Sequence, residues 1–252
     1  MATAKKAESA EIAIQALRLG RTRLRIIGVT PMFQNRMSAK AKQQLLVGGA
    51  KKTRAERSVI KHNPLDEFRA SAEQLASGPT ALGLRVVAVK AAMATAALET
   101  PGLTKTSAQR LLFMPGDYAP LYGVPQLRMD IVRSADINRT PDVRTRAYLP
   151  LWGAELDIQY VVPQLSAQAV VTLLCNAGVL VGVGDYRQEK GKGAFGSFRV
   201  LGDGDEDPVW DELVANHGRQ AQLRALEHPE YADAETADLM DHFFAEQKRR
   251  SA

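Results

Sequence analysis

The sequence is poor in cysteine and in long apolar runs, and each shortage excludes a class of protein. Its single cysteine, Cys175, rules out an internal disulfide framework and any zinc module built from several thiolates. Because Cys175 lies in an apolar segment (170–175), we expect it to be a buried core thiol. No segment is apolar enough to span a bilayer, and the first residues lack the apolar stretch of a secretory signal. We therefore expect a soluble, cytoplasmic protein with no membrane partner.

Aromatic residues are also scarce, at 6% of the chain, but the remaining composition is that of an ordinary globular protein. Apolar residues make up 45% and charged residues 24% of the 252 positions, which excludes global disorder. A chain of this length buries a sizeable core without help from disulfides or a structural metal. We accordingly expect no metal and no other cofactor.

The net charge of +5 is modest, but the charge is distributed very unevenly along the chain. Thirteen bases against three acids give residues 18–69 a net charge of +10. Thirteen acids against five bases give residues 201–252 a net charge of −8. The basic segment at 18–69 predicts a surface that binds a polyanion. The acidic end also suits contact with the basic region of another copy, which predicts self-association.

A short segment near the N-terminus concentrates positive charge on one face of a predicted strand. Arg21, Arg23 and Arg25 alternate with the apolar Leu24 and Ile26. Since side chains alternate across a strand, the apolar residues face the core and three guanidinium groups share the exposed face. Three like charges on one face repel one another unless something negative lies against them. We therefore expect this face to contact nucleic acid.

Elsewhere the pattern predicts an α+β protein. Helices are expected at 10–19, 64–76, 84–98 and 167–177, the last of them capped by Ser166 and ended by Gly178. Strands are expected at 21–27, 126–133, 143–162 and 195–201, and residues 101–125 are expected to be mostly loop. The predicted core covers 1–202, with a long basic insertion at 36–84, and an acidic C-terminal helical extension covers 203–252, broken near His228-Pro229.

The most specific motif is a glycine-rich loop between the helix at 167–177 and the strand at 195–201. Its five glycines and three bases are Gly182, Gly184, Arg187, Lys190, Gly191, Lys192, Gly193 and Gly196. Glycines allow close backbone approach, so their N–H groups can point at phosphates while the bases neutralise charge. The loop is neither a P-loop nor a dinucleotide fingerprint, because a helix precedes it instead of following it. Phe33, Tyr186 and Phe195 lie beside basic or glycine-rich positions and could stack on bases, although the strand position of Phe195 favours the core.

Strand, helix, glycine-rich loop and strand form the second half of a ferredoxin-like unit. The order Gly182-Val183-Gly184, a basic spacer, Gly191-Lys192-Gly193 and then a strand resembles the signature loop of the RAMP superfamily of CRISPR-associated RNA-binding proteins. The first half agrees with this resemblance, because a basic insertion separates the strand at 21–27 from the helix at 84–98. The resemblance implies a ferredoxin-like (RRM-like) core with a long basic insertion and C-terminal helices.

The resemblance also implies a function in antiviral defence. The backbone subunits of CRISPR effector complexes bind single-stranded guide RNA through its backbone, without regard to sequence, and polymerise along it. The implied partners are therefore single-stranded RNA, copies of the same chain and other subunits of the ribonucleoprotein. The residues expected to bind nucleic acid are Arg21, Arg23, Arg25, Lys51, Lys52, Arg54, Gly182, Gly184, Arg187, Lys190, Gly191, Lys192 and Gly193.

Three other functions remain open from the sequence. A single-stranded DNA-binding or annealing protein of a virus or mobile element would use the same residue types, because phosphates are common to both nucleic acids. A guide-processing ribonuclease could use His62 as a general base or acid. A purely structural protein could assemble head to tail through its basic and acidic ends. No metal-ligand spacing of histidines and no Ser-His-Asp or paired-carboxylate pattern stands out, so we do not expect an enzyme.

Overall fold

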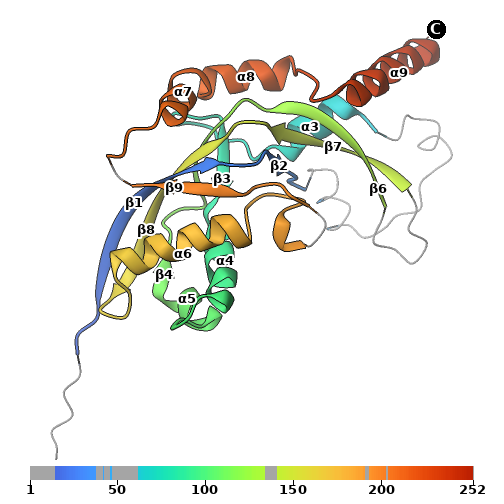
Figure 1. The fold of residues 1–252 in the computed structure, drawn as a ribbon. Helices are drawn as coiled ribbons and strands as arrows, with labels where there is room; N and C mark the ends of the chain where they lie inside the picture. The colour runs from blue at the N-terminus through green and yellow to red at the C-terminus, as the bar shows by residue number, and fades with distance from the viewer. Residues whose placement is uncertain are drawn as a thin grey trace, which may run out of the picture.

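The computed structural model describes residues 15–37, 42, 46, 62–133, 141–190, 193–202 and 204–251, which form two antiparallel sheets with helices around them (Figure 1). The larger sheet has the strand order β3-β5-β8-β1-β9, with β4 paired to β8 off this path. Its strands are β1 (Arg18–Gly28), β3 (Leu82–Arg85), β4 (Leu112–Phe113), β5 (Tyr118–Tyr122), β8 (Gly153–Val162) and β9 (Phe198–Leu201). The smaller sheet has the order β2-β7-β6, from β2 (Met32–Gln34), β7 (Pro141–Leu149) and β6 (Gln126–Arg133). The predicted α+β class is confirmed.

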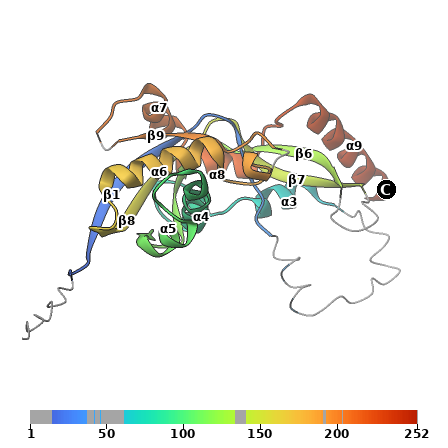
Figure 2. The same ribbon diagram turned by 60° about the horizontal axis from the view of Figure 1, so that its bottom comes forward.

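Helices lie on both sides of the larger sheet and along the smaller one. They are α3 (Pro64–Ser71), α4 (Val86–Ala96), α5 (Lys105–Leu111), α6 (Ala167–Leu180), α7 (Pro208–Asn216), α8 (Arg219–Glu227) and α9 (Ala234–Ser251), with short 3₁₀ helices η1 (Ala97–Glu99) and η2 (Gln188–Lys190). In Figure 1, α4, α5 and α6 lie on one side of this sheet and α7 and α8 on the other. Figure 2 shows α3 and α9 along the β6–β7 pair. Among the helices of the described ranges, none is both long and apolar enough to cross a membrane.

Strand β1, which lies between β8 and β9, has the two faces that its sequence predicts. Leu24 and Ile26 are buried on the side of α6, while Arg21 and Arg23 are exposed on the opposite side. In the neighbouring strand β8, the apolar positions of the predicted alternation are buried in the same way: Ala154, Leu156, Ile158 and Tyr160, together with Trp152 just before the strand. Two faces of matching character therefore meet in one sheet, and the buried face forms the main core with α4 and α6.

Local capping explains where two of the predicted helices begin. The Asn63 side chain accepts a hydrogen bond from the amide of Asp66 at the start of α3, and Pro64 occupies the first turn. The Ser166 hydroxyl accepts a hydrogen bond from the amide of Ala169 at the start of α6. Both side chains satisfy amides that lack partners in the first turn of a helix. The N-termini predicted for these helices are thus confirmed.

Several predicted element boundaries are wrong. In the helix predicted at 10–19, residues 15–19 are not helical, and 18–19 pair with β8 at the start of β1. The part of that prediction at 10–14 lies outside the described residues. The helix that begins at Pro64 ends at Ser71, where the chain turns into an extended segment that carries Glu73 inward. Residues 101–125 contain α5, β4 and β5, because the Thr104 side chain caps a helix there and two short strands pair with the sheet.

Gly178 does not end helix α6, which continues to Leu180. The reason for a glycine at this position is the close passage of β9. A Cβ atom built on Gly178 would lie 2.1 Å from the carbonyl oxygen of Phe198. The helix instead ends at Leu180, and the chain turns away at Gly182, whose backbone has φ +73° and whose amide donates to the carbonyl of Ala177.

The C-terminal helices contact the core through buried polar side chains. The fully buried Gln222 of α8 accepts from the amides of Ala81 and Leu82 and donates to the carbonyls of Leu121 and Gly123. A separate apolar cluster joins α7 to the second face of the sheet, and its buried members are Ile27, Tyr122, Leu201, Trp210 and Leu213. The predicted break near His228-Pro229 is confirmed, because it falls between α8 and α9.

Gly178→Ala should destabilise the protein, although alanine is normally the better helix former by about 1 kcal/mol. Because the new Cβ atom overlaps the carbonyl of Phe198, α6 or β9 has to shift. We expect the free energy of unfolding in urea to fall by about 1–3 kcal/mol, as at other overpacked sites. Val179→Ala is the control: this side chain is 65% exposed, so its change should stay within about 0.5 kcal/mol. A more stable Gly178→Ala protein would contradict this account of the glycine.

Candidate nucleic-acid interface

The glycine-rich loop is folded tightly against the chain that follows β1. The amide of Asp185 donates to the carbonyl of Phe33 at 2.9 Å, and the amide of Gly196 donates to the carbonyl of Pro31 at 2.8 Å. Within the loop, the amide of Val183 donates to the carbonyl of Gly196 at 2.9 Å. These bonds fix the loop next to β2, at the end of the larger sheet.

Close packing accounts for the glycines of this loop. A Cβ atom on Gly184, which has φ +87°, would lie 2.7 Å from the carbonyl oxygen of Phe33. A Cβ atom on Gly193 would lie 1.6 Å from the carbonyl oxygen of Tyr186. The amide of Gly182 already has an acceptor at the end of α6. The fold therefore explains these glycines, and their contact with phosphates stays a prediction.

The predicted contact residues of the loop and the insertion divide into those that the structure describes and those that lie outside the described residues. Arg187 donates to the Glu189 carboxylate through Nε at 3.0 Å and Nη2 at 2.7 Å, and to the carbonyl of Gly184 through Nη1 at 3.3 Å. Its charge is thus balanced within the loop. The backbone of Lys190 ends η2. Outside the described residues lie Lys51, Lys52, Arg54, Gly191 and Lys192.

Arginines on β1 share one face, as predicted, but the protein supplies part of the opposing charge. Arg21 donates to both oxygens of the Asp157 carboxylate on β8, at 2.7 and 2.5 Å. These hydrogen bonds hold the pKa of Asp157 below its usual value and raise the pKa of Arg21. The antiparallel register also places Arg23 opposite Asp157 and Arg25 opposite Glu155. Sequence alone does not show this pairing, because the partners lie more than a hundred residues away.

Arg25 is held by the segment that follows β9. Its Nη2 atom donates to the carbonyls of Gly202 at 2.9 Å and Asp205 at 2.6 Å, and its guanidinium lies 5.5 Å from the ring centre of Trp210. Arg23 is exposed and forms no hydrogen bond or ion pair with the described residues. Of the three arginines, Arg23 is therefore the one whose donors are available to a ligand.

Arginines and aromatic rings gather where β2, β6, β7 and the loop meet. We call this set the arginine–aromatic cluster; it consists of Phe33, Arg128, Arg146, Tyr148, Tyr186 and Phe195. The Arg146 guanidinium lies 4.3 Å from the ring centre of the buried Phe33, whose ring also contacts that of Phe195 at 4.8 Å. Of the predicted stacking residues, Phe33 is thus buried within the protein.

Carboxylates hold the buried arginine of this cluster. Arg146, with a side chain only 5% exposed, donates to Asp130 at 2.7 Å and to Asp185 at 3.1 Å. Burial raises the pKa of Asp185, but hydrogen bonds from Asn35 and the charge of Arg146 outweigh it, so the pKa is lowered overall. Such a buried cation is stable only because it is paired. The alternation of polar residues in β6 and β7 was the one sequence pattern that could have placed Asp130 and Arg146 on the same face of the smaller sheet.

Tyr186 is the outward-facing ring of the cluster. Its side chain is 45% exposed, and its backbone has φ 55°, a left-handed conformation that is uncommon for tyrosine. The ring is backed by that of Phe195, with the centres 5.9 Å apart and the planes tilted by 30°. An exposed ring supported from behind is a suitable surface for a nucleic-acid base.

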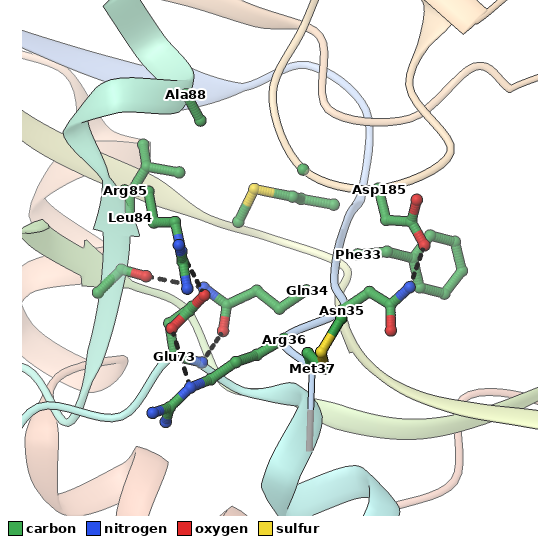
Figure 3. Close-up of a pocket in the computed structure, with 13 residues that line it drawn as sticks. Phe33, Gln34, Asn35, Arg36, Met37, Glu73, Leu84, Arg85, Ala88 and Asp185 are labelled. Carbon is green, nitrogen blue, oxygen red and sulfur yellow. Dashed lines mark hydrogen bonds and ion pairs between the residues drawn. The ribbon is translucent and has the colours of Figure 1, made fainter. Parts of the chain in front are cut away.

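A cavity of about 400 Å³ opens between the loop and the segment after β1 (Figure 3). At one side, the buried carboxylate of Glu73 is paired with Arg85 at 2.5 Å and Arg36 at 3.4 Å and accepts from the Tyr118 hydroxyl at 3.0 Å. At the other side, Asn35 donates to Asp185 at 2.8 Å. The cavity cannot be predicted from the sequence, because its walls come from four separate segments of the chain.

His62 lies between two carboxylates. Its Nδ1 is 2.7 Å from Glu67 on α3 and its Nε2 is 3.0 Å from Asp142 on β7. Both ring nitrogens are therefore occupied by contacts that link α3 to β7. In the described ranges, no group of three or more histidine, cysteine, aspartate or glutamate side chains is arranged to hold a metal ion.

Arg25→Gln should lower the free energy of unfolding by about 1–2 kcal/mol, because it removes hydrogen bonds from a charged donor and the contact with Trp210. Arg23→Gln is the matched control and should change stability by less than about 0.5 kcal/mol. Urea unfolding of both variants at one ionic strength measures the difference. Equal effects for the two variants would show that Arg25 does not anchor the segment after β9.

No protein-family model matches the chain, and no curated protein is significantly similar to it in sequence. Its function therefore has to be inferred from the residues themselves, above all from the glycine-rich loop, the exposed ring of Tyr186 and the arginines whose donors remain available.

Proposed function

We propose that the protein binds single-stranded RNA through its backbone, without regard to sequence, on the surface formed by the glycine-rich loop and its neighbours. The observation that carries the proposal is Tyr186, an exposed ring backed by Phe195 in a loop between α6 and β9. Stacking on such a ring accepts any base, and arginine contacts to phosphates carry no sequence information. A single strand exposes its bases for this kind of contact, whereas a duplex hides them.

The strand order supports the resemblance to the RAMP superfamily. Along the chain, the core elements come in the order β1, α4, β5, β8, α6 and β9. In the larger sheet, the four strands of this set lie side by side in the order β5-β8-β1-β9. A β-α-β-β-α-β unit with antiparallel neighbours and both helices on one face is the arrangement of a ferredoxin-like core. We infer such a core here, with the additional strands β3 and β4, and place the glycine-rich loop at its last connection.

Exposed arginines support binding to a backbone. The side chains of Arg36 and Arg85 are 38% and 48% exposed beside the cavity next to the loop. Arg23 is exposed elsewhere, on β1 near Tyr122 and Trp210. Arg21 and Arg25 would join them only where a phosphate displaced their present partners. The predicted contacts of Lys51, Lys52, Arg54, Lys190 and Lys192 belong to the same proposal.

As a repeating subunit of a CRISPR-type ribonucleoprotein, the chain would contact copies of itself and other subunits along the guide. The opposite charges of its two ends, +10 over residues 18–69 and −8 over residues 201–252, support head-to-tail contact. Assembly along a strand also brings the bound backbone phosphates close to several basic surfaces at once. The number of copies bound should therefore rise with the length of the RNA.

Tyr186→Gly should weaken binding to a short single-stranded RNA by roughly 5- to 150-fold, the effect of losing one stacked base of about 1–3 kcal/mol. Glycine accepts the positive φ at this position, so the fold should survive. Fluorescence anisotropy at fixed salt measures the affinity, and Tyr186→Trp should retain it.

Phe113→Ala is the control for Tyr186→Gly, because Phe113 is an exposed ring on β4, 42% accessible, outside the arginine–aromatic cluster. Its loss should leave RNA affinity unchanged. The same oligonucleotide made as DNA tests the other nucleic acid, and stronger binding to DNA would favour the single-stranded DNA-binding alternative. Wild-type affinity in Tyr186→Gly would remove the loop from the interface.

We further propose that the protein does not cleave RNA. A histidine that acts as general base or acid needs a ring nitrogen that reaches the substrate, and both nitrogens of His62 contact carboxylates. His62→Ala should therefore lower stability, by removing the link between α3 and β7, and leave RNA binding unchanged. Incubation of labelled RNA with each protein, without added metal, should give intact RNA on a denaturing gel. Cleavage by the wild type that disappears in His62→Ala would establish the ribonuclease alternative.

A further inference from the structure

The cavity beside the glycine-rich loop has three kinds of surface (Figure 3). Its floor is apolar and includes Met32, Leu84 and Ala88. One wall carries the arginines that surround Glu73, and the opposite wall carries Asn35 and Asp185. A nucleotide has the same three parts: an apolar base face, an anionic phosphate and a polar base edge.

The arginine wall suits a phosphate group. Arg36 and Arg85 carry two positive charges on this wall, Glu73 carries one negative charge between them, and the charge of Asp117 also acts on Arg85. Both contact Glu73 through Nε, which leaves the Nη donors of each guanidinium without a hydrogen bond to the described residues. Guanidinium Nη donors bind phosphate oxygens in pairs. The free Nη donors therefore favour an anion on this wall.

The opposite wall accepts hydrogen bonds. Asn35 uses its amide nitrogen to donate to Asp185 at 2.8 Å, which leaves its carbonyl oxygen as an acceptor. The Asp185 carboxylate is ionised, since its pKa is lowered, and it accepts from Asn35, Arg146 and the amide of Tyr186. Acceptors on this wall suit the exocyclic amines of adenine, cytosine and guanine. Uracil and thymine have no such amine and offer this wall only the ring N3–H as a donor.

We propose that this cavity holds one unstacked nucleotide of the bound strand, with its base on the apolar floor and its phosphate against Arg36 and Arg85. The inference rests on the proposed binding of single strands. Gly184 and Asp185 belong to the loop, so a strand that stacks on Tyr186 passes the mouth of the cavity. The volume of about 400 Å³ lies near the lower end for ligand sites, which suits a single nucleotide. At this one position bases with an exocyclic amine are preferred, which changes the affinity for a strand without specifying a sequence.

Ala88→Phe tests the cavity, because the larger side chain fills its floor. Val87→Phe is the matched control on the neighbouring residue of α4, where the side chain is 63% exposed and does not line the cavity. Asn35→Leu, at an exposed position on the opposite wall, is a second variant that keeps the test valid where Ala88→Phe fails to fold. Circular dichroism checks the fold of all three variants.

The probe is a short oligoadenylate in which one base is 2-aminopurine, whose fluorescence rises when it leaves the base stack. Wild type and Val87→Phe should raise the fluorescence severalfold on binding. Ala88→Phe should bind with roughly tenfold lower affinity, the size of one well-held base, and give no rise. Wild type should prefer oligoadenylate to oligouridylate, and Asn35→Leu should lose that preference.

Other outcomes separate this inference from the proposed function. An oligonucleotide that binds without a rise, or a rise that persists in Ala88→Phe, would overturn the cavity inference and leave single-strand binding in place. Equal affinity of wild type for oligoadenylate and oligouridylate would overturn the base preference. Adenosine monophosphate alone is the second probe. The wild type could bind adenosine monophosphate but no oligonucleotide, with Ala88→Phe abolishing that binding. This result would overturn the proposed function and the claim that the nucleotide in the cavity belongs to a bound strand. If the wild type binds neither adenosine monophosphate nor an oligonucleotide, the proposed function and the cavity inference are both overturned.

Discussion

Antiparallel pairing of β1 with β8 is the constraint from which the remaining structure follows. The register runs from Arg18 opposite Val162 to Ile27 opposite Gly153, and β9 pairs with the end of β1 on its other edge. This pairing turns Leu24 toward the helices and Arg21 toward the carboxylates of β8. It also decides where β1 ends, and hence where the next residues meet the glycine-rich loop.

A second constraint is the burial of Arg146. A guanidinium this deep needs partners, because an unpaired buried charge is costly. Asp130 and Asp185 provide them, and Asp185 in turn holds Asn35 and the amide of Tyr186. One buried cation therefore positions the acceptor wall of the cavity and the turn that presents the exposed ring. The candidate interface and the core of the smaller sheet are parts of the same hydrogen-bonded network.

Charge in this protein divides into what the fold neutralises and what it leaves available. Arg21, Arg25 and Arg187 have partners within the chain, whereas Arg23 is exposed and Arg36 and Arg85 outnumber the one carboxylate between them. Residues that looked equivalent along the sequence thus differ in what they offer to a polyanion. A surface with a few available arginines, an exposed ring and a small cavity suits a flexible single strand better than a rigid duplex.

Local patterns in the sequence determined the α+β class, the caps at Asn63 and Ser166 and the two faces of β1, because periodicity and capping act over a few neighbouring residues. They also identified the glycine-rich loop and Tyr186. Only the tertiary structure decided which arginines remain available, why Gly178 lies inside a helix, and where Glu73 and Asn35 form a cavity. Those features depend on contacts between residues far apart in the chain, where the register of one strand or the approach of one carbonyl sets the outcome.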